Sequence, residues 1–417
     1  MTTEIVRSPK TPSVIGGAMI IAGTAVGAGM FSLPTVSSGM WFSWALLCLV
    51  FTWFCMFHSG LMILEANLNY PVGASFDTFV KDLLGVGWNI ASGLSVAFVH
   101  YILTYAYISG GGSIVIHTLE STIGAAPPPA IATLLFAFVL AFIVWLSTKA
   151  VSRIATILIG GMVISFIISV GDLTFSVKAS ILFNTLEQNP SYLPFLFAAL
   201  PFFLTSFGFH GNVPSLMKYY GKNPIIIRKC LLYGSLLSLG VFIVWQVCTM
   251  GNVPRADFQQ IVADGGNIGV LVAAVSHTVD SERISALLNM FANLAVISSF
   301  LGVALALFDY IADRFNFDDT VLGRTKTAMV TFVPPTLGGL FFPDGFLYAI
   351  GFAGLAATVF AAFVPALMVR ASRKRFGSPH YQVWGGNALV LLIFLFGLLY
   401  AACHILAMLG LLPIYGR

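Results

Sequence analysis

Long apolar stretches separated by short polar segments run through the whole chain. No charged residue occurs between positions 11 and 64, which leaves room for two membrane spans of about 20 residues each. The same pattern continues to the C-terminus. It predicts eleven spans, at 12–36, 41–64, 87–116, 130–146, 154–170, 192–216, 231–250, 284–308, 328–341, 346–369 and 389–411. The predicted fold class is an all-α polytopic membrane protein with eleven transmembrane helices.

Composition agrees with this interpretation. Of the 417 residues, 58% are hydrophobic and only 9% are charged, whereas a soluble domain carries about 25% charged residues. The five cysteines lie in or beside apolar stretches without metal-ligand spacing, so we interpret them as small hydrophobic residues. The sequence therefore predicts neither a metal site nor a cofactor.

The distribution of basic residues predicts the orientation. With a cytoplasmic N-terminal tail (1–11), the cytoplasmic side receives 16 of the 20 lysines and arginines. Basic residues are enriched in the cytoplasmic loops of membrane proteins. An odd number of spans then places the C-terminus on the opposite side.

Two of the predicted spans contain glycines near the middle of their length. Gly23, Gly27 and Gly29 fall within seven positions of the first span, and Gly208 and Gly211 interrupt the sixth. A glycine inside a helix is less favourable than alanine by roughly 1 kcal/mol. Broken helices at matching places in two halves of a chain indicate a transporter's substrate site. The alternative is that these glycines serve only close helix packing.

The span count predicts an inverted repeat. Five spans fall within 12–171 and five within 192–370, followed by an extra helix at 387–412. Because each half has an odd number of spans, the halves enter the membrane from opposite sides and their breaks face each other near the midplane. Each break exposes carbonyls on one half-helix and N–H groups on the other. These groups complement the ammonium and carboxylate of a free amino acid, without any charged side chain.

The residues around both breaks resemble known transporters. The segments AGTAVGAGMF (22–31) and SFGFHGN (206–212) are similar to the broken first and sixth helices of amino-acid transporters with the LeuT-type five-plus-five inverted repeat. Other segments resemble bacterial aromatic amino acid permeases, namely 57–71, 103–109, 211–222 and 298–303. The resemblance covers essentially the whole chain and is greatest to the tryptophan-specific branch of that family.

This resemblance implies a function and a location. It implies a secondary active transporter that imports tryptophan by proton symport with alternating access across the bacterial inner membrane, with a cytoplasmic N-terminus and a periplasmic C-terminus. The implied partners are tryptophan or a related aromatic amino acid, a proton and membrane lipid, without nucleic acid. A sodium-coupled or broader aromatic or neutral amino acid transporter on the same fold stays open.

The resemblance also implies the residues that contact the substrate. They are Gly23, Thr24, Ala25, Gly27, Ala28 and Gly29 in the first span, and Ser206, Phe207, Gly208 and Phe209 in the sixth. In sodium-coupled relatives, the positions matching Val26, Ser298 and Ser299 hold a sodium ion. Both hydroxyls are present here, so sodium dependence is left open. The lysine that some proton-coupled relatives carry in the middle of span five is absent.

An indole ring requires an apolar, aromatic-lined pocket with an acceptor for its N–H. Phe207 and Phe209 flank the second break, and Tyr101 and Tyr105 lie one turn apart on the third span. We expect these four rings to form the walls of the pocket. Because the chain has 37 phenylalanines, simple packing is the alternative interpretation.

Two ionisable residues are candidates for proton coupling. His210 is the only ionisable residue within either break, and imidazole has a reference pKa of about 6.5. It either carries the proton or stays neutral and caps exposed carbonyls. Glu65 lies near the cytoplasmic end of the second span, where it either pairs with a cation or is solvated.

A membrane enzyme or a channel is the competing functional class. An enzyme needs a nucleophile with its base, or metal-ligand spacing such as His-Glu-x-x-His, and neither pattern occurs. We therefore expect the protein not to be an enzyme. A channel needs no alternating access, so saturable counterflow would exclude it.

Overall fold

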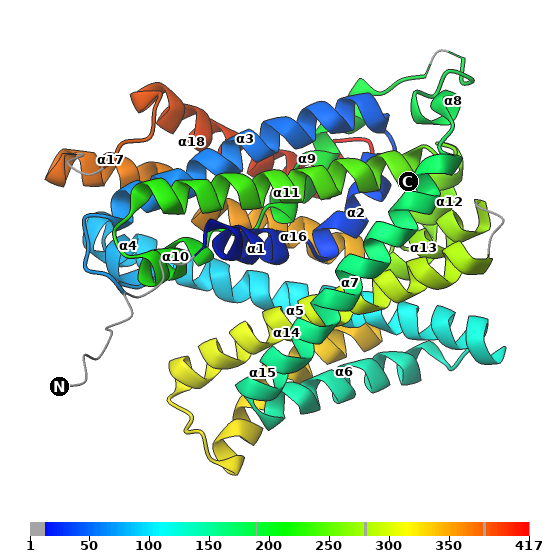
Figure 1. Ribbon diagram of the computed structural model, residues 1–417, viewed down its shortest axis with the longest axis horizontal. Coiled ribbons are helices and arrows are strands. Elements are labelled where there is room, and N and C mark those ends of the chain that lie inside the picture. The colour runs from blue at the N-terminus through cyan, green and yellow to red at the C-terminus, as the bar shows by residue number, and fades with distance from the viewer. Residues whose placement is uncertain (1–12, 189, 279–281, 378–380, 417) are drawn as a thin grey trace, which may run out of the picture.

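Helices dominate the computed structural model, which describes residues 13–188, 190–278, 282–377 and 381–416 (Figure 1). The first half contains α1 (Val14–Ala25), α2 (Ala28–Ser37), α3 (Trp41–Asn67), α4 (Phe76–Leu84), α5 (Val86–Ile123), α6 (Pro129–Leu146), α7 (Thr148–Ser176) and α8 (Ala179–Leu182). The second half begins with a short 3-10 turn, η1 (Leu193–Phe195). It continues with α9 (Leu196–Ser206), α10 (Asn212–Tyr220), α11 (Pro224–Met250), α12 (Asp257–Ala263), α13 (Ile268–Thr278), α14 (Glu282–Phe315), α15 (Val321–Phe341), α16 (Phe346–Thr358), the π-helical turn η2 (Val359–Phe363), α17 (Val364–Phe376) and α18 (Gly386–Met408).

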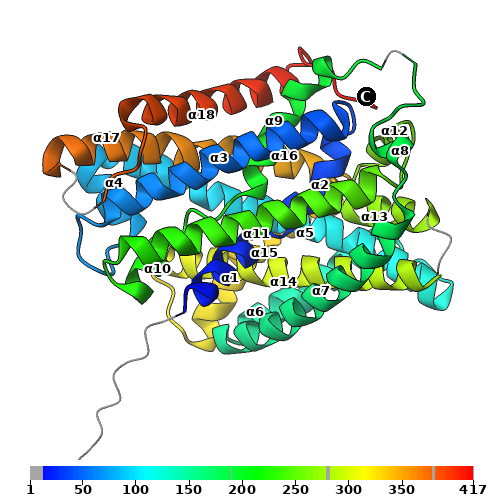
Figure 2. The same cartoon turned by 45° about the horizontal axis from the view of Figure 1, so that its top comes forward.

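The long helices lie side by side and run roughly along the longest dimension of the molecule (Figures 1 and 2). Both views place α4 and α10 at one end of the bundle, and α8, α12 and the C-terminal segment at the opposite end. We refer to these as the α4 end and the α12 end.

The structure supports a multi-pass membrane protein. Among the described residues, eight helices are long and apolar enough to cross a membrane, and a ninth span results if the bent pair α1–α2 is counted as one. Two of the eleven predicted spans fall short of these criteria. The span at 192–216 is divided into α9 and α10, with 11 and 9 residues. The span at 328–341 belongs to α15, which contains Arg324 and Lys326 in its first two turns and is less apolar than the eight.

Local sequence explains where several helices begin. The hydroxyls of Ser13, Ser147 and Thr320 accept hydrogen bonds from backbone N–H groups three residues later, at 3.2, 3.1 and 3.2 Å. The side chain of Asn223 caps α11 in the same way, at 3.2 Å. Such caps satisfy N–H groups that have no partner within the helix. Helix ends are therefore specified locally, whereas the faces that the helices present to one another are not.

Candidate functional site

The first span is interrupted as the glycine pattern predicts. α1 ends at Ala25, Val26 is extended, and α2 begins at Ala28. The two half-helices are bent by 52° relative to each other. The C-terminal end of α1 presents carbonyls at this point, and the N-terminal end of α2 presents N–H groups. An anion therefore finds partial positive charge at α2, and a cation finds partial negative charge at α1.

The second break is longer and is filled with aromatic side chains. α9 ends at Ser206 and α10 begins at Asn212. The connecting backbone turns tightly, because the N–H of Phe209 donates to the carbonyl of Phe207 at 2.9 Å. The rings of Phe207 and Phe209 are fully buried. Gly208 and Gly211 are exposed.

The two breaks touch each other, although almost 180 residues separate them in sequence. A Cβ atom on Gly29 would lie 2.8 Å from the hydroxyl of Ser206 and 2.9 Å from its Cα. Only glycine allows the backbones to approach so closely. On the other side of the breaks, the amide of Asn212 donates to the hydroxyl of Thr24 at 2.6 Å. The exposed ends of four half-helices therefore meet in one place.

Tyr107 lies at the first break, and the sequence interpretation did not name it. A Cβ atom on Gly27 would lie 2.8 Å from the Tyr107 hydroxyl and 3.0 Å from the Ser299 hydroxyl. Tyr107 is almost fully buried on α5, so a hydroxyl donor lies against the N-terminal end of α2. The sequence offered one signal for this residue, namely that Tyr107 lies two positions after Tyr105. Side chains two positions apart on a helix point in directions that differ by about 200°. Tyr105 and Tyr107 therefore cannot both face the breaks.

The residues that resemble a sodium site are only partly brought together. Val26 lies at the break, and the hydroxyl of Ser299 reaches the neighbouring Gly27. The hydroxyl of Ser298 instead donates to the carbonyl of Ala295 on its own helix, at 3.1 Å. Among the described residues, no group of three histidine, cysteine or acidic side chains could hold a metal ion.

Phe207 and Phe209 pack against neighbouring helices. Phe207 meets Phe242 of α11 edge-on, with ring centroids 5.2 Å apart. Phe209 lies over Gly60 of α3, where a Cβ atom would come within 2.9 Å of the ring. These contacts fix the aromatic side of the second break on α3 and α11.

His210 is buried beside the second break. Its ring stacks on Phe209 with centroids 4.8 Å apart, and only 1% of the residue is exposed. Neither ring nitrogen makes a hydrogen bond of good geometry, although the Met56 backbone lies close to the ring. A polar side chain at such depth without full hydrogen bonding is unusual. His210 is therefore poised to gain a partner, rather than fixed by one.

Tyr101 and Tyr105 face away from the breaks, towards α15. They line a groove of about 880 Å³ formed by α5, α15 and α16. Pro334 lacks an N–H and so leaves the carbonyl of Val330 without its helical partner, and the Tyr101 hydroxyl donates to that carbonyl at 3.0 Å. The Tyr105 hydroxyl donates to the carbonyl of Phe342 at 2.7 Å. Both tyrosines thus fasten α15 to α5, so the pocket walls predicted from them are not found at the breaks.

Glu65 is paired and not solvated. Its carboxylate accepts two hydrogen bonds from Arg373 of α17, at 2.6 and 2.8 Å, and a third from the backbone N–H of Val383 at 2.7 Å. Only 2% of the Glu65 side chain is exposed. The pair therefore joins the end of α3 to α17 and to the segment that leads into α18.

The half-helices on the two sides of the breaks differ in burial. On the α12 side, α2 and α9 are largely buried, with Met30, Leu33 and Phe203 fully so. On the α4 side, one face of α1 and one face of α10 are exposed, including Thr24 and Ser215. The half-helices on the α12 side of the breaks are therefore more deeply buried in protein than those on the α4 side.

Comparison with known proteins gives a consistent result. The sequence profile of the tryptophan/tyrosine permease family matches residues 10–404. A tryptophan-specific transport protein of Shigella flexneri is 58% identical over 99% of both chains. One from Pseudomonas aeruginosa (strain UCBPP-PA14) is 57% identical over 100% of both. A low affinity tryptophan permease of Escherichia coli (strain K12) is 46% identical over 98% of this chain and 99% of its own. These matches cover both breaks.

Proposed function

Because the chain belongs to the tryptophan/tyrosine permease family, we propose that it imports tryptophan into bacteria by proton symport with alternating access. The observation that carries this proposal is the contact between the two helix breaks at Gly29 and Ser206. Unwound backbone is tolerated at membrane depth only where it is buried in protein or lines a cavity. Tryptophan import is also supported by the names of the relatives.

In the proposed mode of binding, the breaks hold the charged ends of the amino acid. The carboxylate lies at the N-terminal end of α2, with the hydroxyl of Tyr107 beside Gly27 as an additional donor. The ammonium lies at the carbonyls where α1 ends. The residues implied by resemblance, from Gly23 to Gly29 and from Ser206 to Phe209, provide backbone more than side-chain contacts.

The proposed topology has eleven spans, with an inverted repeat of 12–171 and 192–370 and α18 as an extra helix. It is supported by the position of the breaks, since each lies in the first span of its half. The α4 end carries Arg373 and Arg375, in agreement with a cytoplasmic location under the positive-inside rule. The α12 end, with the C-terminal segment, then faces the periplasm of the inner membrane.

Proton coupling is proposed to run through His210, with Glu65 as the second candidate. His210 lies at the break without a well-formed hydrogen bond, whereas Glu65 is held by Arg373. A zwitterion has no net charge, so one co-transported proton carries one positive charge inward. The membrane potential contributes about 2.3 kcal/mol per 100 mV to that movement. One proton per substrate is sufficient for strong accumulation.

Uptake of labelled tryptophan into proteoliposomes tests this function. An imposed pH gradient, inside alkaline, is expected to drive accumulation without sodium, and tyrosine or phenylalanine in excess to compete weakly. Accumulation that requires a sodium gradient would favour the sodium-coupled alternative, to which Ser299 would contribute. Flux without saturable counterflow would indicate a channel.

The variant His210→Gln separates coupling from binding. It is expected to retain tryptophan exchange between the two sides while losing accumulation driven by the pH gradient, because glutamine cannot carry a proton. Exchange provides the internal control for folding. Unchanged accumulation would remove His210 from this role and leave Glu65→Gln as the next variant.

A further inference from the structure

One arginine at the α12 end is almost fully buried and contacts three separate parts of the chain. Only 4% of Arg255 is exposed. Its Nη1 binds both carboxylate oxygens of Glu187, at 2.8 and 3.0 Å. Its other donors bind carbonyls of Ser38 at 3.1 Å, Gly39 at 2.8 Å and Ser191 at 3.1 Å. A guanidinium group satisfied in this way is a strong and geometrically specific link.

Aromatic rings enclose the same guanidinium group. Its central carbon lies 4.3 Å from the ring centroid of Tyr415 and 5.1 Å from that of Tyr192. Cation–π contacts of this kind gain strength where water is excluded. Burial tends to raise the pKa of Glu187, but hydrogen bonds from Asn184 and Arg255 outweigh it and keep that pKa below its ordinary value. The carboxylate therefore stays charged at neutral pH.

The Arg255 contacts are made at the C-terminal end of α2. Ser38 and Gly39 directly follow α2, the half-helix whose N-terminal end forms the first break. A Cβ atom on Gly39 would lie 2.6 Å from Phe195 and 2.8 Å from Tyr415. The end of α2 is therefore clamped between the start of α9 and the C-terminal segment, with Arg255 bonded to its carbonyls.

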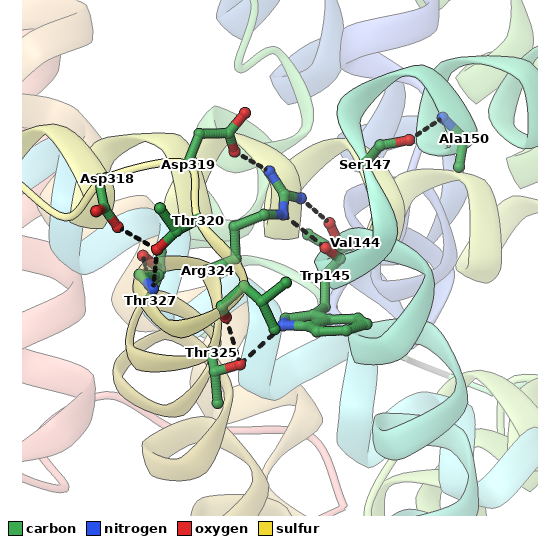
Figure 3. A network of polar contacts seen from close by, with 12 residues as sticks. Val144, Trp145, Ser147, Ala150, Asp318, Asp319, Thr320, Arg324, Thr325 and Thr327 are labelled. Atoms are coloured by element: carbon green, nitrogen blue, oxygen red, sulfur yellow. Dashed lines mark hydrogen bonds and ion pairs between the residues drawn. The ribbon is translucent and has the colours of Figure 1, made fainter.

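A second arginine makes similar bonds elsewhere but does not touch a broken span. Figure 3 shows Arg324, which donates to the carbonyls of Trp145 at 2.7 Å and Val144 at 2.9 Å, and to Asp319 at 2.7 Å. These bonds cap the end of α6 and join it to α15, which are both continuous helices. Arg324 thus serves as a matched control with the same chemistry.

We propose that Arg255 is a positioning residue for substrate access: it holds α2 in the closed arrangement at the α12 end and releases it whenever the pathway at that end opens. This inference rests on the proposed alternating-access function. Arg255 binds Ser38 and Gly39 after α2 and also Glu187 and Ser191 before α9, so α2 cannot move away from α9 without breaking one of these two sets of bonds. Arg255 therefore acts through α2, and it does not itself contact the substrate.

A cysteine on α2, close to the bonds from Arg255 to Ser38 and Gly39, reports whether the α12 end opens. Thr35 lies on α2, one turn before Ser38; it is 1% exposed and its hydroxyl has no hydrogen-bond partner. Thr35→Cys is therefore a conservative probe. The native cysteines are all buried, and the protein without Thr35→Cys gives the background. The measurement is the rate at which a membrane-impermeant maleimide, added from the α12 side of vesicles, modifies Thr35→Cys.

The expected result is slow modification with Arg255 present and modification about tenfold faster in Arg255→Gln. Loss of the Arg255 bonds shifts the equilibrium between the closed and the open state of the α12 end towards the open state. Gly39→Ala tests the same clamp sterically and is expected to accelerate modification as well. Arg324→Gln should leave the rate unchanged. Equilibrium binding of tryptophan to each variant confirms that it is folded.

Three outcomes overturn the proposal. One is equal modification of Thr35→Cys with and without Arg255 in protein that binds tryptophan. Another is equal acceleration by Arg324→Gln, which would indicate general loosening of the fold. If neither Arg255→Gln nor Gly39→Ala binds tryptophan, Arg255 is a folding residue and the proposal also fails. Absence of tryptophan uptake by the wild type would refute the transport function separately, because the modification rates do not depend on it.

Discussion

Each end of the molecule contains a buried arginine that is paired with a glutamate, but the two pairs join different elements. At the α12 end, Arg255 and Glu187 clamp the half-helix α2. At the α4 end, Arg373 and Glu65 join α3 to α17, neither of which is interrupted at a break. The half-helices at the α4 end, α1 and α10, keep an exposed face. The same chemistry therefore holds a half-helix at one end and two continuous helices at the other.

This difference shows that a buried ion pair matters through the elements that it joins. A pair between continuous helices stabilises the scaffold, whereas a pair on a half-helix also controls the position of a binding site. Under the proposed orientation, the half-helices on the periplasmic side are the more deeply buried ones. Four predictions test or refine this comparison.

The largest effect is expected at the point where the two sides meet. Gly29→Ala places a methyl group within 3 Å of Ser206, and neither backbone can move without displacing its half-helix. We expect tryptophan binding and transport to fall by more than about 100-fold, because a 1 Å displacement of a site is already costly. Gly240→Ala on α11, where a Cβ atom meets nothing within 4 Å, is the control. Normal binding by Gly29→Ala would refute the close contact of the breaks.

The second prediction concerns accessibility at the two ends. Ser215 lies on the exposed face of α10, whereas Thr35 is buried on α2. We expect Ser215→Cys to react with an impermeant maleimide at least about tenfold faster than Thr35→Cys, because the reaction needs a water-exposed thiolate. Inverted and right-side-out vesicles together measure the rate from each side. Two equally unreactive positions would indicate that the α10 face meets lipid and not water.

The third prediction compares the ion pairs directly. Glu65→Gln leaves a buried guanidinium without its counter-charge and is expected to destabilise the protein by about 3–5 kcal/mol. Arg255 is also buried, but the side chain of Glu187 is 40% exposed, and Arg255 keeps the carbonyl acceptors of Ser38, Gly39 and Ser191 when the carboxylate is removed. Glu187→Gln should therefore destabilise the protein by only about 1 kcal/mol. Unfolding in mixed detergent micelles gives both values. Equal losses would mean that burial does not distinguish the two pairs.

The smallest effect is expected for the bond between the accessible half-helices. Asn212→Ala removes the hydrogen bond to Thr24, which is partly open to water. A single bond of this kind contributes about 1 kcal/mol, so tryptophan affinity should change less than tenfold. Gln260→Ala, which removes an exposed amide hydrogen bond to Asp264 at the α12 end, is the comparison for binding. A complete loss of binding in Asn212→Ala would show that this bond is essential to the site.

Much of the fold and the positions of the two helix breaks were predictable from the sequence. The apolar stretches predicted a polytopic helical membrane protein, and the glycines predicted where two spans break, since glycine disfavours helix locally. Of the three glycines in the first span, only Gly27 lies in the break itself, whereas Gly23 and Gly29 lie within α1 and α2. The count of eleven spans stays a prediction, because α9, α10 and α15 are too short or too polar to be recognised as spans by composition. The roles of individual site residues also stay predictions.

The side chains that face the breaks were decided by the tertiary structure. Tyr107 lies at Gly27, while Tyr101 and Tyr105 fasten α15, and Glu65 finds Arg373 across 308 residues of sequence. In a soluble helix, the polar face indicates which side is buried. In a membrane span, lipid and protein interior are similarly apolar, so the sequence carries little information about rotation around the helix axis. Local backbone preference thus set the position of the breaks, and only packing between helices set which residues surround them.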